Sequence, residues 1–355
     1  MPHLILATTA SSNPMGAQRY EQEISRGAPA AVPEWTVRRE VFRSMRSPLE
    51  GTRRLPMGWL AGATPRERRL LGGLAFPGRD DLVHRMDLVL PPGRGADVVT
   101  IHDTVAWRFP DESAPIAAAP EEARRADAVI CVSAFTANEV VEFLGVRDPV
   151  VVHNGVDERF FGAPPLTRPV RERLGLIEPF VLHTGGASRR KNLTALAEAW
   201  PTIRRARPGL LLALMGPEHP ERTRLFAGLD GVRLLGRQPD ELVPAIIASA
   251  AAVVVPSTYE GFGLPALEAM AAGVPVVAAD TSSLPEVVGD AGLLVPPTSA
   301  GIITGVVDLL GSPADAAAIV ARGRTRAAEF TWQRAVEGHT RVWRSVADRG
   351  PADVA

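Results

Sequence analysis

The residues best placed to do chemistry lie in one glycine-containing stretch that carries two glutamates, Glu260 and Glu268. Glu260 stands directly before the loop 261–263, and Glu268 lies one turn into a helix predicted to begin at Pro265. Glycines let backbone N–H groups approach a ligand closely, and the N-terminus of a helix favours an anion. The stretch therefore predicts a binding site for a negatively charged ligand.

Glu268 is the more informative of the two carboxylates. A glutamate on a helix is usually solvated, but the neighbours of Glu268 are Ala266, Leu267, Ala269 and Met270. A charge kept on such an apolar helix indicates a bound partner, such as a ribose diol that donates charge-assisted hydrogen bonds of roughly 1.5–3 kcal/mol each. We therefore expect Glu268 to bind the ribose of a nucleotide.

A second candidate anion site is a basic run between a glycine pair and the start of a predicted helix. The glycines are Gly185 and Gly186, and the basic residues are Arg189, Arg190 and Lys191. Basic side chains at the head of a helix suit a phosphate group. Taken alone, the run fits a solvated basic turn equally well, and it is the order of the neighbouring motifs that favours the anion site.

The first half of the chain offers weaker signals. A predicted strand over 98–101 ends in His102 and Asp103. A histidine after a strand is more often structural, but ligands of open α/β sheets bind at the carboxyl ends of the strands, which favours a binding role for His102. Asp103 is expected only to orient the loop. Gly16, in the segment 14–17 after the first strand, is a weak glycine-loop signal.

The stretch from Glu260 to Glu268 resembles the E-x7-E signature of retaining glycosyltransferases of family 4, the glycosyltransferase group 1 type. The resemblance implies the GT-B fold, in which two Rossmann-like α/β domains face each other across a cleft. It also implies a nucleotide diphosphate sugar as donor. The basic run and the histidine occur in the order that this family has them.

Residue roles follow from the resemblance. Arg190 and Lys191 would neutralise the donor diphosphate, Glu260 would hold hydroxyls of the donor sugar, and His102 would contact that sugar or a phosphate oxygen. Arg237 follows a predicted strand near the nucleobase, where a surface arginine is an equally good interpretation. The implied catalytic residues are His102, Arg190, Lys191 and Glu260, and the implied donor-binding residues are Gly16, Gly185, Gly186, Arg190, Lys191, Gly261, Phe262, Gly263, Leu264, Glu268 and Arg237.

No metal or other cofactor is expected. The sequence has no Asp-x-Asp, and its histidines and carboxylates do not have metal-ligand spacing. Neutralising the diphosphate is therefore assigned to Arg190, Lys191 and helix dipoles. The family often has arginine where this chain has Gly186, which implies either fewer phosphate contacts or a substitute role for Arg189.

Composition limits the classes of partner and location. The 39 basic and 40 acidic residues nearly cancel, which argues against a nucleic-acid partner. The single cysteine, Cys131, excludes an intrachain disulfide framework and a thiolate metal cluster. Without an apolar run of about eighteen residues, no membrane span is expected. A cytoplasmic location is predicted, with contact to the inner face of a membrane as an open alternative.

The elements that must position these residues read as two α/β domains. In the second half the predicted strands are 180–183, 210–215, 232–235, 252–255, 274–278 and 293–295, and the predicted helices are 192–205, 241–248 and 265–272. In the first half the predicted strands are 4–7, 98–101, 128–132 and 150–153. Gly162-Ala163-Pro164-Pro165 has linker composition, so we predict an acceptor-binding domain over 1–163 and a donor-binding domain over 164–331. An amphipathic helix within 332–355 is expected to pack back on the first domain.

The region 36–79 is a separate feature, with ten arginines and three glutamates interleaved with apolar residues. Such a segment suits an anionic membrane surface or a phosphate-bearing lipid acceptor. A helix pair that packs on the sheet with its arginines in water explains the same pattern equally well.

The prediction for function is a retaining, metal-independent transfer of a hexose, of mannosyl or glucosyl type, to a saccharide, lipid-linked or small-molecule acceptor. The alternatives are an epimerase or hydrolase of nucleotide sugars with the same fold, and a non-catalytic subunit that binds a sugar nucleotide. The sequence leaves the donor base, the acceptor and the oligomeric state open.

Overall fold

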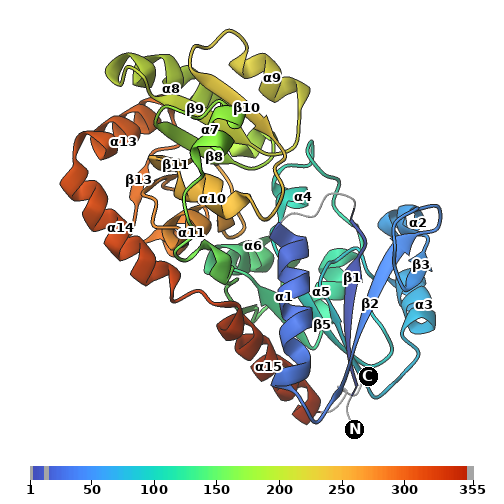
Figure 1. Ribbon diagram of the computed structural model, residues 1–355. Coiled ribbons are helices and arrows are strands. Elements are labelled where there is room, and N and C mark those ends of the chain that lie inside the picture. Colours follow the sequence, from blue (N-terminus) through green and yellow to red (C-terminus); the bar gives the residue numbers. More distant parts are fainter. Residues whose placement is uncertain (1–2, 12–15, 350–355) are drawn as a thin grey trace. The chain divides into compact units, whose positions relative to one another are not determined.

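The computed structural model describes residues 3–11 and 16–349 and divides the chain into two compact units. Unit 1 consists of Met1–Gly155 and Trp332–Ala355, and unit 2 consists of Val156–Thr331. Each unit contains one parallel β-sheet with helices packed against it (Figure 1). Both units therefore have an α/β architecture, as the alternating pattern of predicted strands and helices indicates.

Unit 2 contains a six-stranded sheet in the order β10-β9-β8-β11-β12-β13. Its strands are β8 (Phe180–Thr184), β9 (Leu211–Met215), β10 (Val232–Gly236), β11 (Ala252–Val255), β12 (Val276–Ala279) and β13 (Leu293–Val295). Its helices are η1 (Glu158–Phe160), α7 (Arg168–Leu174), η2 (Arg189–Lys191), α8 (Leu193–Ala206), α9 (Pro220–Phe226), α10 (Val243–Ala248), α11 (Leu264–Ala271), α12 (Leu284–Val288), α13 (Ser299–Gly311) and α14 (Pro313–Ala327). All six predicted strands and all three predicted helices of this half are confirmed.

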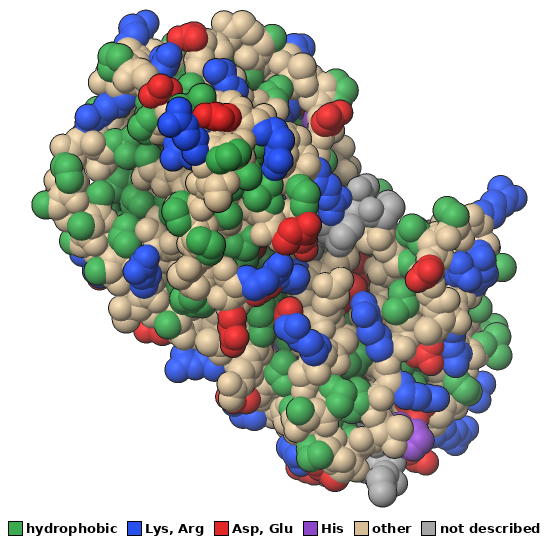
Figure 2. Space-filling model, in the orientation of Figure 1, with side chains coloured by type: hydrophobic (Ala, Val, Ile, Leu, Met, Phe, Trp, Pro, Cys, Tyr) green, Lys and Arg blue, Asp and Glu red, His purple; other side chains and the backbone are tan. Residues whose placement is uncertain are grey.

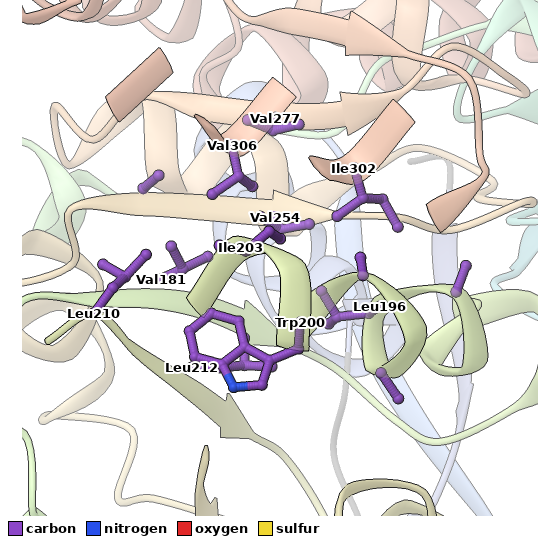
Figure 3. Packing of buried hydrophobic residues seen from close by; sticks show 14 of the residues in the cluster. Val181, Leu196, Trp200, Ile203, Leu210, Leu212, Val254, Val277, Ile302 and Val306 are labelled. Carbon is purple, nitrogen blue, oxygen red and sulfur yellow. The ribbon is translucent and has the colours of Figure 1, made fainter. Parts of the chain in front are cut away.

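The core of unit 2 explains why its strands are easy to recognise in the sequence. Helices α8 and α13 cover one face of the sheet, and their apolar side chains meet those of the central strands (Figure 3). Trp200 is the largest buried side chain there, and its Nε1 donates to the carbonyl of Asp230 at 2.7 Å. The four inner strands, β8, β9, β11 and β12, are buried on both faces, and they are therefore almost entirely apolar.

Unit 1 contains a seven-stranded parallel sheet in the order β3-β2-β1-β4-β5-β6-β7. Its strands are β1 (His3–Thr9), β2 (Thr36–Ser44), β3 (Arg53–Leu55), β4 (Asp81–Arg85), β5 (Ala96–Ile101), β6 (Ala128–Cys131) and β7 (Val150–Val151). Its helices are α1 (Gly16–Ala31), α2 (Met57–Gly62), α3 (Pro65–Ala75), α4 (Val105–Arg108), α5 (Ala119–Arg125), α6 (Ala134–Leu144) and α15 (Trp332–Arg349). Helix α15 packs beside α1 in this unit (Figure 1).

Three strands of unit 1 were not expected. The segment 36–44, which was expected to be helical if it packs on the sheet, forms β2 and pairs with β1 from Thr36 to Phe42. Its side chains are mostly exposed or half-buried, so the apolar signal of a buried strand is absent. Strand β4 is central but carries His84 and Arg85, both fully buried.

The boundary between the units differs from the predicted one at residues 163 and 164. Val156 already belongs to unit 2, where its N–H donates to the carbonyl of Phe330 at 3.0 Å and its strand segment bridges to Thr331. Phe160 is buried in η1, which contacts α10 and α11. The linker-like residues 162–165 therefore lie inside unit 2, because the segment before them packs on its helices.

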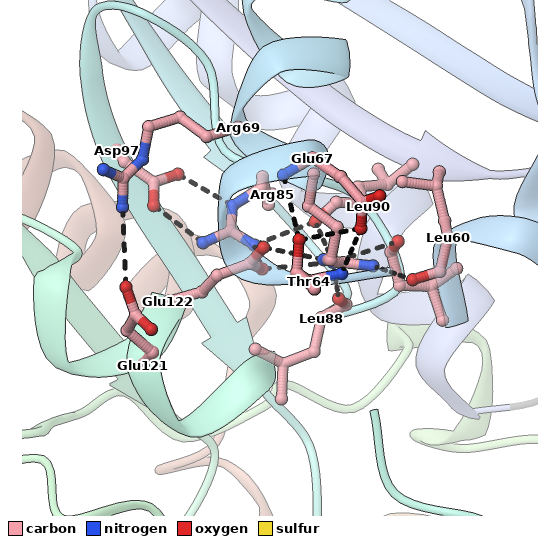
Figure 4. Close-up of polar contacts among 12 residues, drawn as sticks. Leu60, Thr64, Glu67, Arg69, Arg85, Leu88, Leu90, Asp97, Glu121 and Glu122 are labelled. Carbon is pink, nitrogen blue, oxygen red and sulfur yellow. Dashed lines mark hydrogen bonds and ion pairs between the residues drawn. The ribbon is translucent and has the colours of Figure 1, made fainter. Parts of the chain in front are cut away.

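A buried ion network joins β4, β5, α3 and α5 in unit 1 (Figure 4). Arg85 binds Asp97 through two hydrogen bonds of 2.8 and 2.7 Å and Glu122 through one of 3.2 Å. Arg68 binds the same Glu122 at 2.7 and 3.1 Å. Burial alone would lower the pKa of Arg85, but the charges of Asp97 and Glu122 raise it. The network thus buries two cations and two anions, and their charges cancel.

A chain of hydrogen bonds crosses the other side of unit 1, from α15 through the sheet to α1 and back. Trp343 Nε1 only donates, and it donates to His84 Nδ1 at 3.2 Å. His84 Nε2 must then carry the proton in the neutral ring, and it donates to Thr100 Oγ1 at 2.8 Å. Burial lowers the pKa of His84, which keeps the ring neutral. The tautomer of His84 is therefore fixed.

The same donor-to-acceptor direction continues to the end of this chain of hydrogen bonds. Thr100 Oγ1 is left to donate to Tyr20 Oη at 2.7 Å, and Tyr20 donates to His339 Nε2 at 2.6 Å. His339 Nδ1 donates to the carbonyl of Ala335 at 2.7 Å. Burial raises the pKa of Tyr20 and lowers that of His339 to about 4. Every group in the chain is satisfied only while both histidines are neutral.

The ion network predicts a large difference between two adjacent glutamates. Glu122→Ala removes the anion that Arg68 and Arg85 share, so we expect a loss of about 3–5 kcal/mol in the free energy of unfolding of unit 1. Glu121→Ala, the matched control, removes only exposed pairs with Arg125 and Arg69 and should cost less than about 1 kcal/mol. Chemical denaturation measures both, and equal losses would contradict the assignment.

The histidine chain predicts a loss of stability in acid. The unfolded chain takes up a proton on His339 near its ordinary pKa of 6.5, whereas the folded chain does so only near 4. The contribution is therefore fully present above pH 6.5 and is lost as the pH falls toward 4, on the order of 3 kcal/mol. His339→Gln should flatten the fall of the melting temperature over this range, and the exposed His3→Gln should not. Identical pH profiles in all three proteins would refute the prediction.

Candidate functional site

The candidate site of unit 2 lies at the carboxyl ends of two adjacent strands, β8 and β11. Strand β8 continues into the glycine pair, η2 and α8. Strand β11 continues into the loop that contains Glu260 and then into α11. The carboxyl ends of parallel strands meet at one edge of the sheet, so two segments that are distant in the sequence form one site.

Lys191 and Glu260 form a buried ion pair at this edge. Lys191 Nζ lies 2.6 Å from Glu260 Oε1, and the two residues are 8% and 6% exposed. Ser257 Oγ donates to the same oxygen at 2.7 Å. Burial alone would raise the pKa of Glu260, but the charge and hydrogen bond of Lys191 hold it below its usual value. Glu260 is therefore ionised at neutral pH.

The backbone around this pair is tied down from both sides. The N–H of Glu260 donates to Ser282 Oγ at 3.0 Å, and its carbonyl accepts from Ser283 Oγ at 2.9 Å. The N–H of Thr258 donates to the carbonyl of Arg190 at 2.8 Å. The basic run and the glutamate loop are thus hydrogen-bonded to each other.

Asn192 closes the turn between η2 and α8. Its φ of 55° lies in the left-handed region, which asparagine tolerates better than most residues. Its Nδ2 donates to the carbonyls of Pro256 and Pro297, both at 3.0 Å. Sequence reasoning treated Asn192 only as a helix start, whereas the structure gives it the task of fixing the basic run against the end of β11.

The two predicted glycines of the first loop differ in their surroundings. Gly185 has a φ of 140°, and its carbonyl would lie 2.0 Å from a Cβ added to Gly216. Gly216 was not predicted, although a glycine directly after strand β9 is the signal that marks it. Nothing lies within 4 Å of a Cβ added to Gly186, so the position where the family often has arginine is open in this chain.

His183, the penultimate residue of β8, is a polar group that sequence reasoning assigned only to a strand. It is 1% exposed, and its Nδ1 donates to the carbonyl of Val254 at 3.2 Å. Burial lowers its pKa to about 4, so the ring is neutral and Nε2 is an acceptor. Within the described residues Nε2 has no hydrogen-bond partner, and it lies 3.9 Å from a Cβ added to Gly185. A buried, unused acceptor therefore faces the glycine loop.

Helix α11 presents the remaining predicted residues of the loop. Gly263 precedes the helix with a φ of 105°, and a Cβ there would lie 2.9 Å from Leu284. Phe262 is buried, with its ring edge-to-face against Phe330, so only the backbone of Phe262 is offered to a ligand. Gly261, Leu264 and Glu268 are half-buried, and Glu268 lies between the buried Leu267 and Ala269. Arg237 is exposed after β10.

His102 and Gly16 belong to unit 1, whereas the site residues described above belong to unit 2. His102 follows β5, and its ring stands edge-on to Tyr20 at 4.7 Å between centroids. A hydrogen bond to the backbone of Met86 holds the ring, and burial lowers its pKa. Its Nε2 is buried without a hydrogen-bond partner among the described residues. Asp103 Oδ1 accepts from the N–H of Val105 at 3.1 Å, the loop-orienting task expected of it.

Gly16 is the first residue of α1, and residues 14 and 15 of the predicted glycine loop lie outside the described residues. Among residues 3–11 and 16–349, no group of three or more His, Cys, Asp or Glu residues is arranged to hold a metal ion. In the same part of the chain no single helix is long and apolar enough to cross a membrane, and the pair α13 and α14, which passes by length and composition together, is bent by 101°.

Comparison with known proteins finds a matching family for each half of the chain. The family described as "Glycosyl transferases group 1" matches residues 178–312. The family described as "Glycosyltransferase Family 4" matches residues 28–160. O-antigen chain mannosyltransferase B of Escherichia coli is 30% identical over 273 residues, 72% of this chain and 72% of that protein. An MMP alpha-(1->4)-mannosyltransferase of Mycolicibacterium hassiacum is 34% identical over 221 residues, 59% of this chain and about half (52%) of that protein.

Solved structures share the architecture. A sucrose-phosphate synthase from Thermosynechococcus elongatus aligns with a TM-score of 0.76 at 21% identity, over 98% of this chain and 100% of that one. HepE of Anabaena in complex with UDP and glucose aligns with a TM-score of 0.76 at 20% identity, over 97% of this chain and 100% of that one. At these identities the likeness shows the fold alone. Taken with the sequence matches, it establishes that the chain belongs to family 4 of the glycosyltransferases, the group 1 type, and has the GT-B fold.

Proposed function

We propose that this glycosyltransferase transfers a hexose from a nucleotide diphosphate sugar, with retention of the anomeric configuration and without a metal ion. The observation that carries the proposal is the buried pair of Lys191 and Glu260, fixed beside the glycine loop by hydrogen bonds from both sides. A buried cation in a rigid frame is suited to stabilising charge on a leaving group. Lys191 and Arg190 are proposed to take this role for the diphosphate.

The ammonium group of Lys191 has three N–H donors, and Glu260 Oε1 occupies one of them. The proposal gives the other donors to phosphate oxygens. Glu260 Oε1 already accepts from Lys191 and Ser257, so Oε2 is assigned to a hydroxyl of the donor sugar. Glu268, half-buried on α11, is assigned to the ribose. His183 Nε2 is a further acceptor at the same loop.

The chemical step requires little covalent work from the protein. The bond between the anomeric carbon and the diphosphate oxygen breaks, and the acceptor hydroxyl oxygen bonds to the same face of that carbon. The hydroxyl proton passes to the departing phosphate oxygen. Alignment and charge stabilisation then supply the rate enhancement. The contact of His102 with the transferred sugar stays a prediction from the family resemblance.

Mannose is the sugar to test first, because two relatives at 30% and 34% identity are named mannosyltransferases. The acceptor is proposed to be a saccharide, a lipid-linked saccharide or a small molecule, and the structure favours none of the three. HepE, which shares the fold, was solved with UDP and glucose, so UDP-glucose is the second donor to test.

The experiment is a melting screen with GDP-, UDP- and dTDP-sugars in the presence of a chelator. A donor at 100 times its Kd should raise the free energy of unfolding by about 2.7 kcal/mol. That donor is then supplied with saccharide acceptors, and the new glycoside is analysed by NMR for its anomeric configuration. Inversion, a strict metal requirement or the absence of stabilisation would each refute part of the proposal. Free sugar, an epimerised donor or binding without turnover would favour the hydrolase, epimerase or non-catalytic alternatives.

Two substitutions separate donor binding from turnover. Glu268→Ala should raise the Kd for the donor about tenfold or more, since one charge-assisted hydrogen bond contributes roughly 1.5–3 kcal/mol. The matched control is Glu198→Ala on α8, an exposed glutamate of the same unit.

Lys191→Ala should lower mainly kcat, by about a hundredfold or more. Calorimetry and steady-state kinetics measure both.

Lys191→Ala also leaves Glu260 buried without its cation, which costs stability. The double variant Lys191→Met with Glu260→Gln removes both charges and should fold while remaining inactive. Unchanged nucleotide binding in Glu268→Ala would overturn the ribose assignment. Substantial turnover by the folded double variant would overturn the role of the ion pair.

A further inference from the structure

Arg222 of α9 is a buried cation without a counter-ion. It is 3% exposed, and it forms an ion pair with no carboxylate of the described residues. Burial lowers the pKa of Arg222, and no anion raises it again. In unit 1, by contrast, Asp97 and Glu122 raise the pKa of the equally buried Arg85. A buried charge is costly unless it is paired, so the charge of Arg222 calls for a partner that the protein does not supply.

The surroundings of Arg222 in the sequence do contain carboxylates. Basic and acidic side chains are interspersed over the surface of unit 2 that Figure 2 shows. Arg224, two residues further along α9, is exposed and pairs with Glu221 at 3.7 Å. Glu218, before the helix, is exposed and makes no ion pair within the described residues. None of these carboxylates follows Arg222 into the interior.

The guanidinium group of Arg222 is held against the first glycine loop of the candidate site. Its Nη2 donates to the carbonyl of Gly185, and its Nη1 donates to the carbonyl of Pro217 at 3.0 Å. Gly216 leaves room for it, because a Cβ there would lie 3.2 Å from Nη1. The Nε of Arg222 is buried and has no hydrogen-bond partner in the described part of the chain.

The bond from Arg222 to Gly185 also sets the direction of the next N–H group. In a trans peptide the C=O and the N–H point in opposite directions. Because the carbonyl of Gly185 is turned toward Arg222, the N–H of Gly186 points away from it. Among residues 3–11 and 16–349 this N–H has no hydrogen-bond partner. Arg222 therefore orients an unused backbone donor at the glycine loop.

Lys191 and Arg222 act on the same place from two elements. Lys191 Cε lies 3.8 Å and His183 Nε2 3.9 Å from a Cβ added to Gly185, whose carbonyl binds Arg222. Burial is the main cause of the low pKa of His183, and the charges of Lys191 and Arg222 lower it further. Glu260 compensates the charge of Lys191. The charge of Arg222 is left over, which suits this loop to an anion.

We propose that Arg222 is a positioning residue for the diphosphate of the donor. It orients the Gly186 N–H toward a phosphate oxygen, and the bound diphosphate balances its buried charge across the peptide that it holds. The inference rests on the proposed function and extends it, since it adds a cation from α9, a helix in which the sequence indicated no site residue.

The test is calorimetry of the full chain with UDP, GDP, dTDP and inorganic pyrophosphate at several salt concentrations. Arg222→Met should raise the Kd of the diphosphate that binds best by about tenfold or more, and should flatten its salt dependence. Arg222→Lys keeps the charge and should recover most of this loss. The matched control is Arg224→Met on the same helix, an exposed arginine whose loss should leave the Kd unchanged.

A second-site variant separates charge from mere support of the loop. Nothing lies within 4 Å of a Cβ added to Gly186, so Gly186→Arg places a new cation in open space at the same loop. Combined with Arg222→Met, it should restore part of the affinity for diphosphate. Support of the Gly185 carbonyl alone would not be restored in this way.

Arg222→Gln, a neutral variant that retains a hydrogen-bond donor, keeps the test available if Arg222→Met does not fold, and melting temperatures report folding. Diphosphate binding as tight in the folded neutral variants as in the unchanged protein would overturn the inference and leave the proposed function standing. Equal losses in Arg222→Lys and the neutral variants, without rescue by Gly186→Arg, would reduce Arg222 to a structural residue and also overturn it. If the unchanged protein bound none of the four diphosphates, the proposed function itself would fall, and the inference with it.

Discussion

The organising constraint of the donor half is the cost of burying an ionised carboxylate. Glu260 is 6% exposed, and its charge is stable there because Lys191 and Ser257 bind one of its oxygens. These partners come from two loops, so the ion pair also sets the distance between the loops that follow β8 and β11. The hydrogen bonds of Thr258 and Asn192 then fix the remaining freedom of the basic run. The charge balance of the site and the spacing of its two loops thus depend on one contact.

Buried charges are also compensated in unit 1, where their pairing fixes the position of a helix. Arg68 and Arg85 share Glu122 in a place that water does not reach, and this sharing anchors α3 to α5 and to the central strands. A helix fixed from its inner side has a defined outer side. The exposure of Leu70 and Leu74 is therefore a property of a rigid helix, which distinguishes it from the exposure of a frayed segment.

The sequence predicted the parts of the structure in which burial and apolar composition coincide. The inner strands of unit 2 were found because both of their faces are covered, and the two-glutamate loop was found because its glycines and helix start are local signals. Strand β4 was missed because His84 and Arg85 are compensated by partners distant in the chain, which no local pattern reveals. The unused acceptor of His183 was missed for the same reason, since it appears only in three dimensions, whereas Gly216 had a local signal in its place directly after β9.

The hydrogen-bond chain of unit 1 starts and ends on α15, which follows unit 2 in the sequence. Trp343 supplies its first donor and the carbonyl of Ala335 its last acceptor, and Tyr20 of α1 lies between them. During synthesis the sheet of unit 1 therefore lacks α15 until residues 156–331 have been made, which takes roughly 10 to 35 s at about 5–20 residues per second. Unit 2 is continuous in sequence, so it can fold before unit 1 is completed. The residues of α1 are thus synthesised before unit 2 but reach their final packing only after it.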